Sequence, residues 1–331
     1  MSNDKFLRDS YKHFQSVRDA RFQMGWDRHS LIPSFVLGGD RYRALLSPEP
    51  IRIPENNTQD IYHAYHRAGN LEKWKQVVEP YCYPSMFAHL FCLLVCGFGP
   101  PLLHFLGAES LLINQYGRMG SGKTILRKII HSIYGRHSDL ELIGDDSLTS
   151  IIKQCGAAGS LPVTIANNSN EDKWKEVSLG VKLGRVPRKA NNKSDNRWQL
   201  VALVTSHYKL KTHEKYILHI PVEYQKEISP LAQVGMSYYL TENYGEAGAI
   251  YIQYLLDTYH KHPTNLKKIT AVLSRTGLVT DNFSPDLLTA GTLALYAAIV
   301  VSELRLMNVP ITEFHSWIAK KLPGLIGTEL R

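Results

Sequence analysis

The chain has 331 residues, enough for one large or two ordinary domains with a buried core. Hydrophobic residues make up 44% of it and charged residues 21%, proportions that exclude an intrinsically disordered protein. Lysine and arginine outnumber aspartate and glutamate by 38 to 30, and the resulting net charge of +8 suits a polyanionic partner such as nucleic acid, although it equally suits a protein without one.

The N-terminal region, residues 1–83, predicts a mixed α/β segment. Its spacing of apolar residues predicts a helix over 4–23, a strand over 34–39 that ends in a glycine turn, and a loop over 48–57. A short helix is expected over 70–81, with Asn70 as its N-cap. The opening residues lack the apolar centre of a signal peptide.

Two apolar runs are long enough to be compared with membrane spans. The run over 86–107 contains two histidines and a Pro-Pro break, and the run over 287–301 is about 15 residues long, short of the roughly 20 that a span requires. We therefore expect both to form buried helices, with no membrane partner. The four cysteines are few and irregularly spaced, which predicts free thiols and a cytoplasmic location.

Short apolar strands alternate with helices after residue 110. Strands are expected over 110–116, 140–144, 161–166, 198–206 and 215–222, and helices over 123–135 and 147–156. This alternation predicts an α/β fold, a three-layer P-loop NTPase core with a mainly parallel sheet, over residues 84–230. From residue 231 to 331 the pattern is almost entirely helical and predicts a C-terminal bundle.

The segment between the first of these strands and its helix matches G-x-x-x-x-G-K-[ST] in full, and it lies in the required strand-to-helix context. In such a loop the glycines let backbone N–H groups surround a phosphate, and the dipole of the following helix favours the negative charge. We expect Lys123 to reach the β- and γ-phosphates of ATP and the Thr124 hydroxyl to hold Mg²⁺. The predicted nucleotide-binding residues are Gly117, Arg118, Met119, Gly120, Ser121, Gly122, Lys123, Thr124 and Ile125.

The acidic pair that a P-loop ATPase needs for magnesium and for water activation is missing from the expected strand end. The strand about 40 residues after Lys123 ends in Ala166-Asn167, or in Asn167-Asn168 if the alignment shifts by one residue. An amide is no base, but Asn167 can orient a water molecule or ligate weakly through its oxygen. Other carboxylates that could substitute are Glu171, Asp172, Asp145 and Asp146, and Asp145 is more simply explained as a turn or capping residue.

The motifs, in their order along residues 34–318, resemble the phage- and plasmid-type helicase ATPases, AAA+-like P-loop modules that are often fused to a primase. The resemblance rests on "SFVLGG", "GRMGSGKT", "GSLPVTI", "GRVPRK", "WQLVALVTS" and "NYGEAGAIYIQYLL" in that order. It implies a homo-oligomeric, hexameric ring, ATP at subunit interfaces, single-stranded DNA in the channel, and the cytoplasm of a bacterial host. This family would place Asp-Glu at Ala166 and Asn167, so hydrolysis is in question.

The same resemblance gives roles to two further groups of residues. Ser206 or His207, at the end of the last apolar strand before residue 210, would sense the γ-phosphate, with a simple strand-end cap as the alternative. Arg185 or Arg188 would be an arginine finger. These arginines belong to a basic segment that could also grip single-stranded DNA or lie solvated, and its charged residues are Lys182, Arg185, Arg188, Lys189, Lys193, Asp195 and Arg197.

Three functions remain open on the sequence alone. The first is an ATP-dependent DNA helicase or translocase module of a phage or mobile-element replication system. The second is a nucleotide-binding assembly or regulatory module that does not hydrolyse ATP, which the Ala166-Asn167 pair favours. The third is a P-loop small-molecule kinase, for which the sequence offers no acceptor site.

Overall fold

A five-stranded parallel sheet forms the centre of the protein. The structure is a computed structural model, and it describes residues 23–28, 30, 32–51, 59–167, 172–184, 197–210, 217–223, 228–276 and 285–323. The strands are β5 (Leu111–Tyr116), β6 (Leu142–Ile143), β7 (Val163–Ala166), β8 (Val201–Ser206) and β9 (Ile217–Pro221), in the spatial order β6-β7-β8-β5-β9. Every neighbouring pair is parallel, so the predicted parallel sheet is confirmed.

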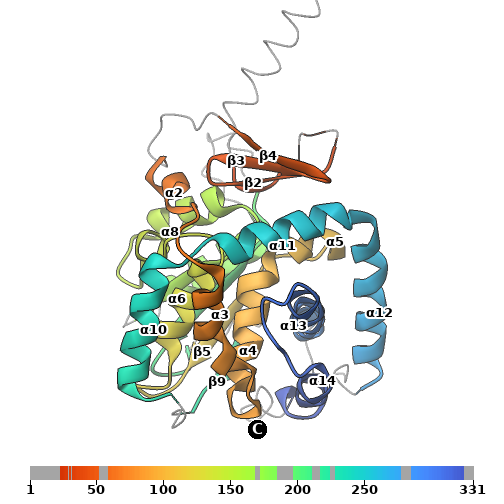
Figure 1. The fold of residues 1–331 in the computed structure, drawn as a ribbon. Helices are drawn as coiled ribbons and strands as arrows, with labels where there is room; N and C mark the ends of the chain where they lie inside the picture. Colours follow the sequence, from red (N-terminus) through yellow and green to blue (C-terminus); the bar gives the residue numbers. More distant parts are fainter. Residues whose placement is uncertain are drawn as a thin grey trace, which may run out of the picture.

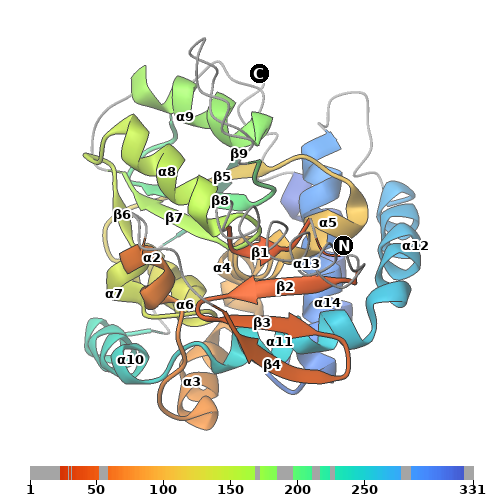
Figure 2. The same cartoon turned by 90° about the horizontal axis from the view of Figure 1, so that it is seen from above.

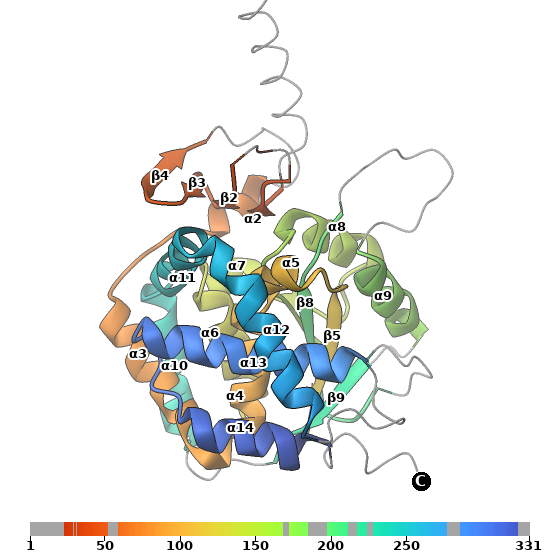
Figure 3. The same cartoon turned by 90° about the vertical axis from the view of Figure 1, so that its right-hand side faces the viewer.

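Helices cover both faces of this sheet, which explains why successive residues of β5, β7 and β8 are buried rather than every second one. Helices α8 (Leu148–Ala158) and α9 (Asp172–Leu183) lie on one face, and α6 (Lys123–Ser132) lies with the C-terminal helices on the other (Figures 2 and 3). The predicted three-layer α/β architecture is therefore confirmed. The short α7 (His137–Leu140) connects α6 to β6.

The N-terminal region contributes a four-stranded antiparallel sheet made of β1 (Gly25–Trp26), β2 (Ser34–Leu37), β3 (Asp40–Arg43) and β4 (Leu46–Pro50). This sheet packs over α11 (Glu246–Asp257) (Figure 1). The predicted loop over 48–57 was wrong at its start, because Pro48 and Pro50 lie in the exposed edge strand β4, where a missing N–H costs no ladder bond. Residues 52–58, and most of the helix predicted over 4–23, lie outside the described residues.

The segment before β5 is a series of short, buried helical turns. After α2 (Gln59–Ala64), helix α3 (Leu71–Val78) begins at Asn70, whose side chain accepts hydrogen bonds from the backbone of Glu72 (2.7 Å) and Lys73 (3.4 Å), so the predicted N-cap is confirmed. The predicted buried helices then follow as 3-10 turns Glu79–Cys82 and Pro84–Met86, α4 (Phe87–Leu93), a π-helical turn Leu94–Phe98, a 3-10 turn Pro100–Leu102 and α5 (Leu103–Leu106).

The C-terminal region is helical, as predicted, with α10 (Pro230–Glu242), α11, a 3-10 turn Tyr259–Lys261, α12 (His262–Ser274), α13 (Pro285–Glu303) and α14 (Ile311–Lys320). Helix α13 has 19 residues, four more than its apolar run, and by length and composition alone it could cross a membrane. The protein itself buries 67% of the 18-residue apolar window in that helix, which packs beside the π-helical turn, as a core helix does. The expectation of a buried helix is confirmed.

Candidate functional site

The glycine-rich loop connects the end of β5, at Tyr116, to the first residue of α6, Lys123. Gly120 and Gly122 have φ angles of 81° and 84°, in the left-handed region that side chains with a Cβ rarely adopt. Gly117 is required for a different reason, because a Cβ there would lie 2.2 Å from the backbone oxygen of Val222 after β9. Each glycine that the motif requires thus has a local steric cause.

Lys123 bends back over the loop from the first position of α6. Its Nζ donates hydrogen bonds to the backbone oxygens of Gly117 (2.6 Å) and Arg118 (2.8 Å) and to Ser121 Oγ (3.0 Å). Burial, and then the charge of Arg127, lower the pKa of Lys123 to about 8. The lysine therefore remains mostly protonated at neutral pH, and a bound anion would be a better partner for its charge than these neutral oxygens.

His89 of α4 contacts the glycine-rich loop through its buried ring. Its Nε2 lies 2.6 Å from the backbone oxygen of Ser121, and its ring is fully buried. Burial lowers the pKa of His89 to about 4, an effect reinforced by the Lys123 charge and opposed by the bond to Ser121. The ring is therefore neutral at pH 7, and because a carbonyl oxygen only accepts, Nε2 must carry the proton.

A cavity of about 240 Å³ opens beside this loop. Its walls come from the loop and α6, from the ends of β7 and β8, and from α10, so it lies at the carboxyl edge of the sheet, where ligands of open α/β sheets bind. The residues lining it are Met119, Gly120, Ser121, Gly122, Lys123, Thr124, Arg127, Ala166, Asn167, Thr205, Ser206, His207 and Gln233. Sequence reasoning had named most of these but missed Arg127, Thr205 and Gln233.

The end of β7 brings Ala166 and Asn167 to the cavity. The Asn167 N–H donates to the backbone oxygen of Thr205 (2.8 Å), and Gly144 N–H donates to that of Ala166 (2.5 Å). The cavity lining contains no aspartate or glutamate within the described part of the chain. This end of the sheet therefore offers an amide where an ATPase of the expected family has its acids.

Of the carboxylates named as substitutes, Asp145 and Asp146 are described, and neither lines the cavity. Asp145 is exposed in the turn after β6, and Asp146 accepts a hydrogen bond from the Ile143 N–H (2.8 Å) in the same turn, while Ser147 is the N-cap of α8. The simpler turn explanation for Asp145 thus holds. Glu171 lies outside the described residues, and Asp172 begins α9.

The end of β8 presents Thr205, Ser206 and His207 to the cavity. The hydroxyls of Thr205 and Ser206 have different hydrogen-bond partners. Ser206 Oγ accepts from Asn114 Nδ2 (2.8 Å) and donates to the Tyr208 backbone oxygen (2.5 Å), so the single proton that it could offer to a phosphate oxygen is already engaged. Thr205 Oγ1 accepts from the Arg127 guanidinium, which leaves the threonine proton available to a ligand. His207 is solvent-exposed at the rim.

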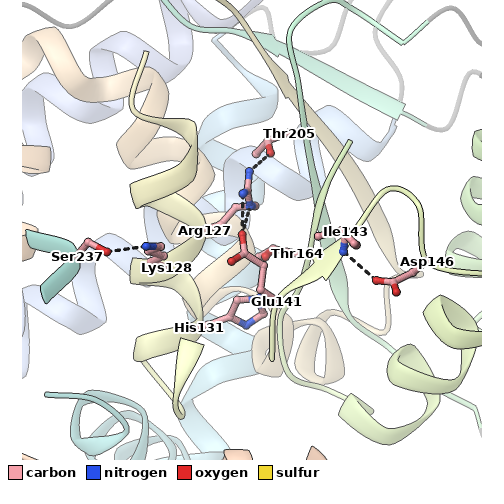
Figure 4. Close-up of polar contacts among 9 residues, drawn as sticks. All are labelled: Arg127, Lys128, His131, Glu141, Ile143, Asp146, Thr164, Thr205 and Ser237. Carbon is pink, nitrogen blue, oxygen red and sulfur yellow. Dashed lines mark hydrogen bonds and ion pairs between the residues drawn. The ribbon is translucent and has the colours of Figure 1, made fainter. Parts of the chain in front are cut away.

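Arg127 is the most connected of the residues that sequence reasoning missed. Its side chain is 8% exposed, and it donates to Glu141 Oε1 through Nε (2.9 Å) and Nη2 (2.6 Å), in addition to Thr205 (Figure 4). It follows Lys123 by four positions, which places both on one face of α6. That spacing was the only signal in the sequence, and it says nothing of partners 14 and 78 residues away.

The basic segment between α9 and β8 is described only at its ends. Lys182, expected in a loop, lies in α9, and its Nζ bonds Asp286 of α13 (2.6 Å) and Glu109 (3.3 Å) because the helix extends to Leu183. Arg197 is exposed. The finger candidates Arg185 and Arg188, with Lys189, Lys193 and Asp195, lie outside the described residues.

The residues present fit the phosphates of a nucleotide better than they fit a metal. The loop has room only for glycine at position 117, its bends at Gly120 and Gly122 have positive φ angles, and two cations, Lys123 and Arg127, line the cavity. For Mg²⁺ the described lining offers the exposed Thr124 hydroxyl and the Asn167 amide, and no group of three histidines, cysteines or carboxylates gathers anywhere in the described chain. Magnesium there would take its remaining ligands from phosphate and water.

Comparison with family models and with the curated proteins assigns no function to this chain. A family model described as a domain of unknown function, DUF927, matches residues 4–147, which include β5, the loop and α6 but not β7 to β9. A search of the curated proteins found no match.

Among solved structures, "SCCmec type IV Cch - active helicase" is similar with a TM-score of 0.73 at 13% identity, over 98% of this chain and 64% of that one. An inhibitor-bound JCV helicase (TM-score 0.33, 11% identity, 70% of this chain and 66% of that one) and the NrS-1 C-terminal region (TM-score 0.35, 13% identity, 92% and 79%) are more distant and add no argument. The chain thus spans less than two thirds of the Cch helicase chain, and it shares with that chain an α/β P-loop NTPase-like fold.

Proposed function

We propose that this protein binds ATP in the cavity beside residues 117–124 and works as the nucleotide-driven module of a DNA helicase or translocase. One observation carries the proposal: a loop of the required composition joins a central parallel strand to α6, and two cations line a cavity at its edge. Backbone N–H groups of the loop and the Lys123 ammonium would hold the β- and γ-phosphates.

The proposal extends to the partners of such a module. We propose a homo-oligomeric ring acting on single-stranded DNA, with a primase domain or partner and a phage or mobile-element replication system as its setting. The fold shared with the Cch helicase and the basic balance of the chain support these partners. Two roles remain predictions within this scheme: an arginine finger at Arg185 or Arg188, and a γ-phosphate sensor at Ser206 or His207. The hydrogen bonds that engage Ser206 weigh against Ser206 as the sensor.

A second function is favoured by the cavity lining itself. The chain would bind ATP without turning it over, because Ala166 and Asn167 stand where the acids would be and the described lining supplies no other carboxylate. Bound ATP would then stabilise the folded chain or its assembly by mass action.

ATP hydrolysis by the purified protein, with and without single-stranded DNA, separates the two functions. The motor predicts DNA-stimulated turnover that Lys123→Ala abolishes, whereas Lys128→Ala keeps it, because Lys128 lies on the far side of α6 and bonds Ser237 (2.5 Å). ATP binding without turnover would select the second function, and the double change Ala166→Asp, Asn167→Glu would then be the variant in which to look for restored hydrolysis. Absence of ATP binding altogether would reject both.

A further inference from the structure

Arg127 lies deep in the cavity wall, one helical turn along α6 from Lys123. Helical side chains lean toward the helix N-terminus, so the guanidinium is carried back toward the glycine-rich loop. Figure 4 shows it directed between Glu141, which precedes β6, and Thr205 at the end of β8, while the neighbouring Lys128 points away toward Ser237.

The bonding of Arg127 leaves it able to take a further acceptor. A guanidinium has five N–H donors, and the bonds to Glu141 and Thr205 use one each from Nε, Nη1 and Nη2. Nε and Nη2 both donate to the same oxygen of Glu141, Oε1, and this fixes the plane of the guanidinium. The contact is not the bidentate arrangement in which two parallel N–H groups bond the two oxygens of a carboxylate. Two N–H groups are thus left for a ligand in the cavity.

Thr205 completes a pair of donors. Its hydroxyl accepts from Arg127, so its own hydrogen is available to donate, and it is 3% exposed at the cavity wall. A β-phosphate held by the loop would place a terminal phosphate toward the end of β8, because β8 is the strand that pairs with β5 on the cavity side. Arg127 and Thr205 therefore face the position that only a triphosphate fills.

We propose that Arg127, together with Thr205, makes this site select a nucleoside triphosphate over the diphosphate, with Glu141 holding the guanidinium in place. The inference rests on the proposed nucleotide-binding function and adds to it a residue that reads the terminal phosphate. Neither residue belongs to the glycine-rich motif or to the predicted sensor pair.

The test is the pair of equilibrium affinities for ATP and for ADP, measured by calorimetry at the same Mg²⁺ concentration. Wild type should bind ATP more tightly, and Arg127→Met should lose at least about tenfold in ATP affinity while its ADP affinity stays within about twofold, since one charge-assisted hydrogen bond is at stake. The matched control is Lys128→Met, which removes the same charge from the opposite side of the same helix turn and should change neither affinity.

Arg127→Met leaves the buried side of Glu141 unpaired, so Arg127→Lys and Thr205→Val accompany it and each variant is checked by circular dichroism. Arg127→Lys keeps the charge and should lose part of the preference for ATP, and Thr205→Val removes one donor and should lower that preference severalfold. An unchanged ATP-to-ADP ratio in the folded variants, or equal losses for both nucleotides, would overturn the assignment.

The failure of this inference differs from the failure of the proposed function. If wild type binds both nucleotides through Lys123 and the ratio of ATP to ADP affinity does not change in the Arg127 variants, only the role of Arg127 is refuted. If wild type binds neither nucleotide, the proposed function falls and this inference falls with it.

Discussion

Acid should destabilise this protein in part through His89, which the fold keeps neutral beneath the glycine-rich loop. The folded-state pKa of His89 is lowered to about 4, mainly by burial, whereas an unfolded histidine titrates near 6.5. As the pH falls below about 6.5, His89 binds a proton in the unfolded chain but stays neutral in the folded chain. The stability contributed by the neutral ring is therefore complete above that pH and is lost progressively down to about pH 4.

The size of the effect follows from the two pKa values. At pH 5 the difference in proton uptake by this one ring amounts to about 2 kcal/mol of unfolding free energy. Other buried histidines add to the wild-type slope, among them His131, whose pKa burial lowers to about 3. The informative quantity is thus the difference between wild type and a variant that lacks only the His89 ring.

His89→Gln is the suitable variant, because its amide nitrogen can still donate to the Ser121 oxygen while the side chain cannot titrate. Urea unfolding at pH 7.5 and pH 5.0 should show that the variant loses about 2 kcal/mol less than wild type between the two values. The control is His63→Gln, which changes an exposed ring on α2 and should keep the wild-type difference. Equal losses in wild type and His89→Gln would refute the reasoning.

Three further changes test other parts of the structure. Ser206→Ala should cost about 1–2 kcal/mol in a thermal or urea melt, because the buried Asn114 amide loses its shorter acceptor (2.8 Å) and keeps only the Val204 oxygen (3.4 Å), yet it should leave ATP affinity within about twofold if the sensor is elsewhere. Gly117→Ala should destabilise the fold by more than about 2 kcal/mol, and should weaken nucleotide binding with it, since the added methyl meets the Val222 oxygen; an unaltered melting curve would count against this loop geometry. Asn70→Ala should lower the unfolding free energy by about 1 kcal/mol through loss of the α3 cap, and a neutral result would mean that the cap contributes nothing in solution.

The parts of the fold that the sequence predicted are those decided by local rules. Buried parallel strands are short apolar runs, so β5, β7, β8 and β9 could be placed to within a few residues. The glycine-rich motif fixes its own loop because the conformations of Gly120 and Gly122 are nearly closed to other residues. The edge strand β4 was missed because its prolines are typical of loops, and only its position at the edge of a sheet makes them tolerable.

The parts of the site that the sequence missed are those decided by contacts between distant segments. Arg127 and Glu141 are ordinary surface-type residues until α6, β6 and β8 are packed together. In the same way, strand alternation alone does not say which of Thr205 and Ser206 has a hydroxyl to spare, since that depends on Asn114 in the neighbouring strand. The support of the loop by His89 links residues 32 positions apart and has no motif.

The most direct test of the account is equilibrium binding of ATP to the wild-type protein and to Lys123→Ala, with Lys128→Ala as the matched control. The account predicts that wild type and the control bind ATP with similar affinity and that Lys123→Ala loses at least about tenfold, because the ammonium that would otherwise rest on Gly117 and Arg118 is gone. Equal affinity in wild type and Lys123→Ala, or no binding to any of the three, would contradict the claim that this loop is a nucleotide site.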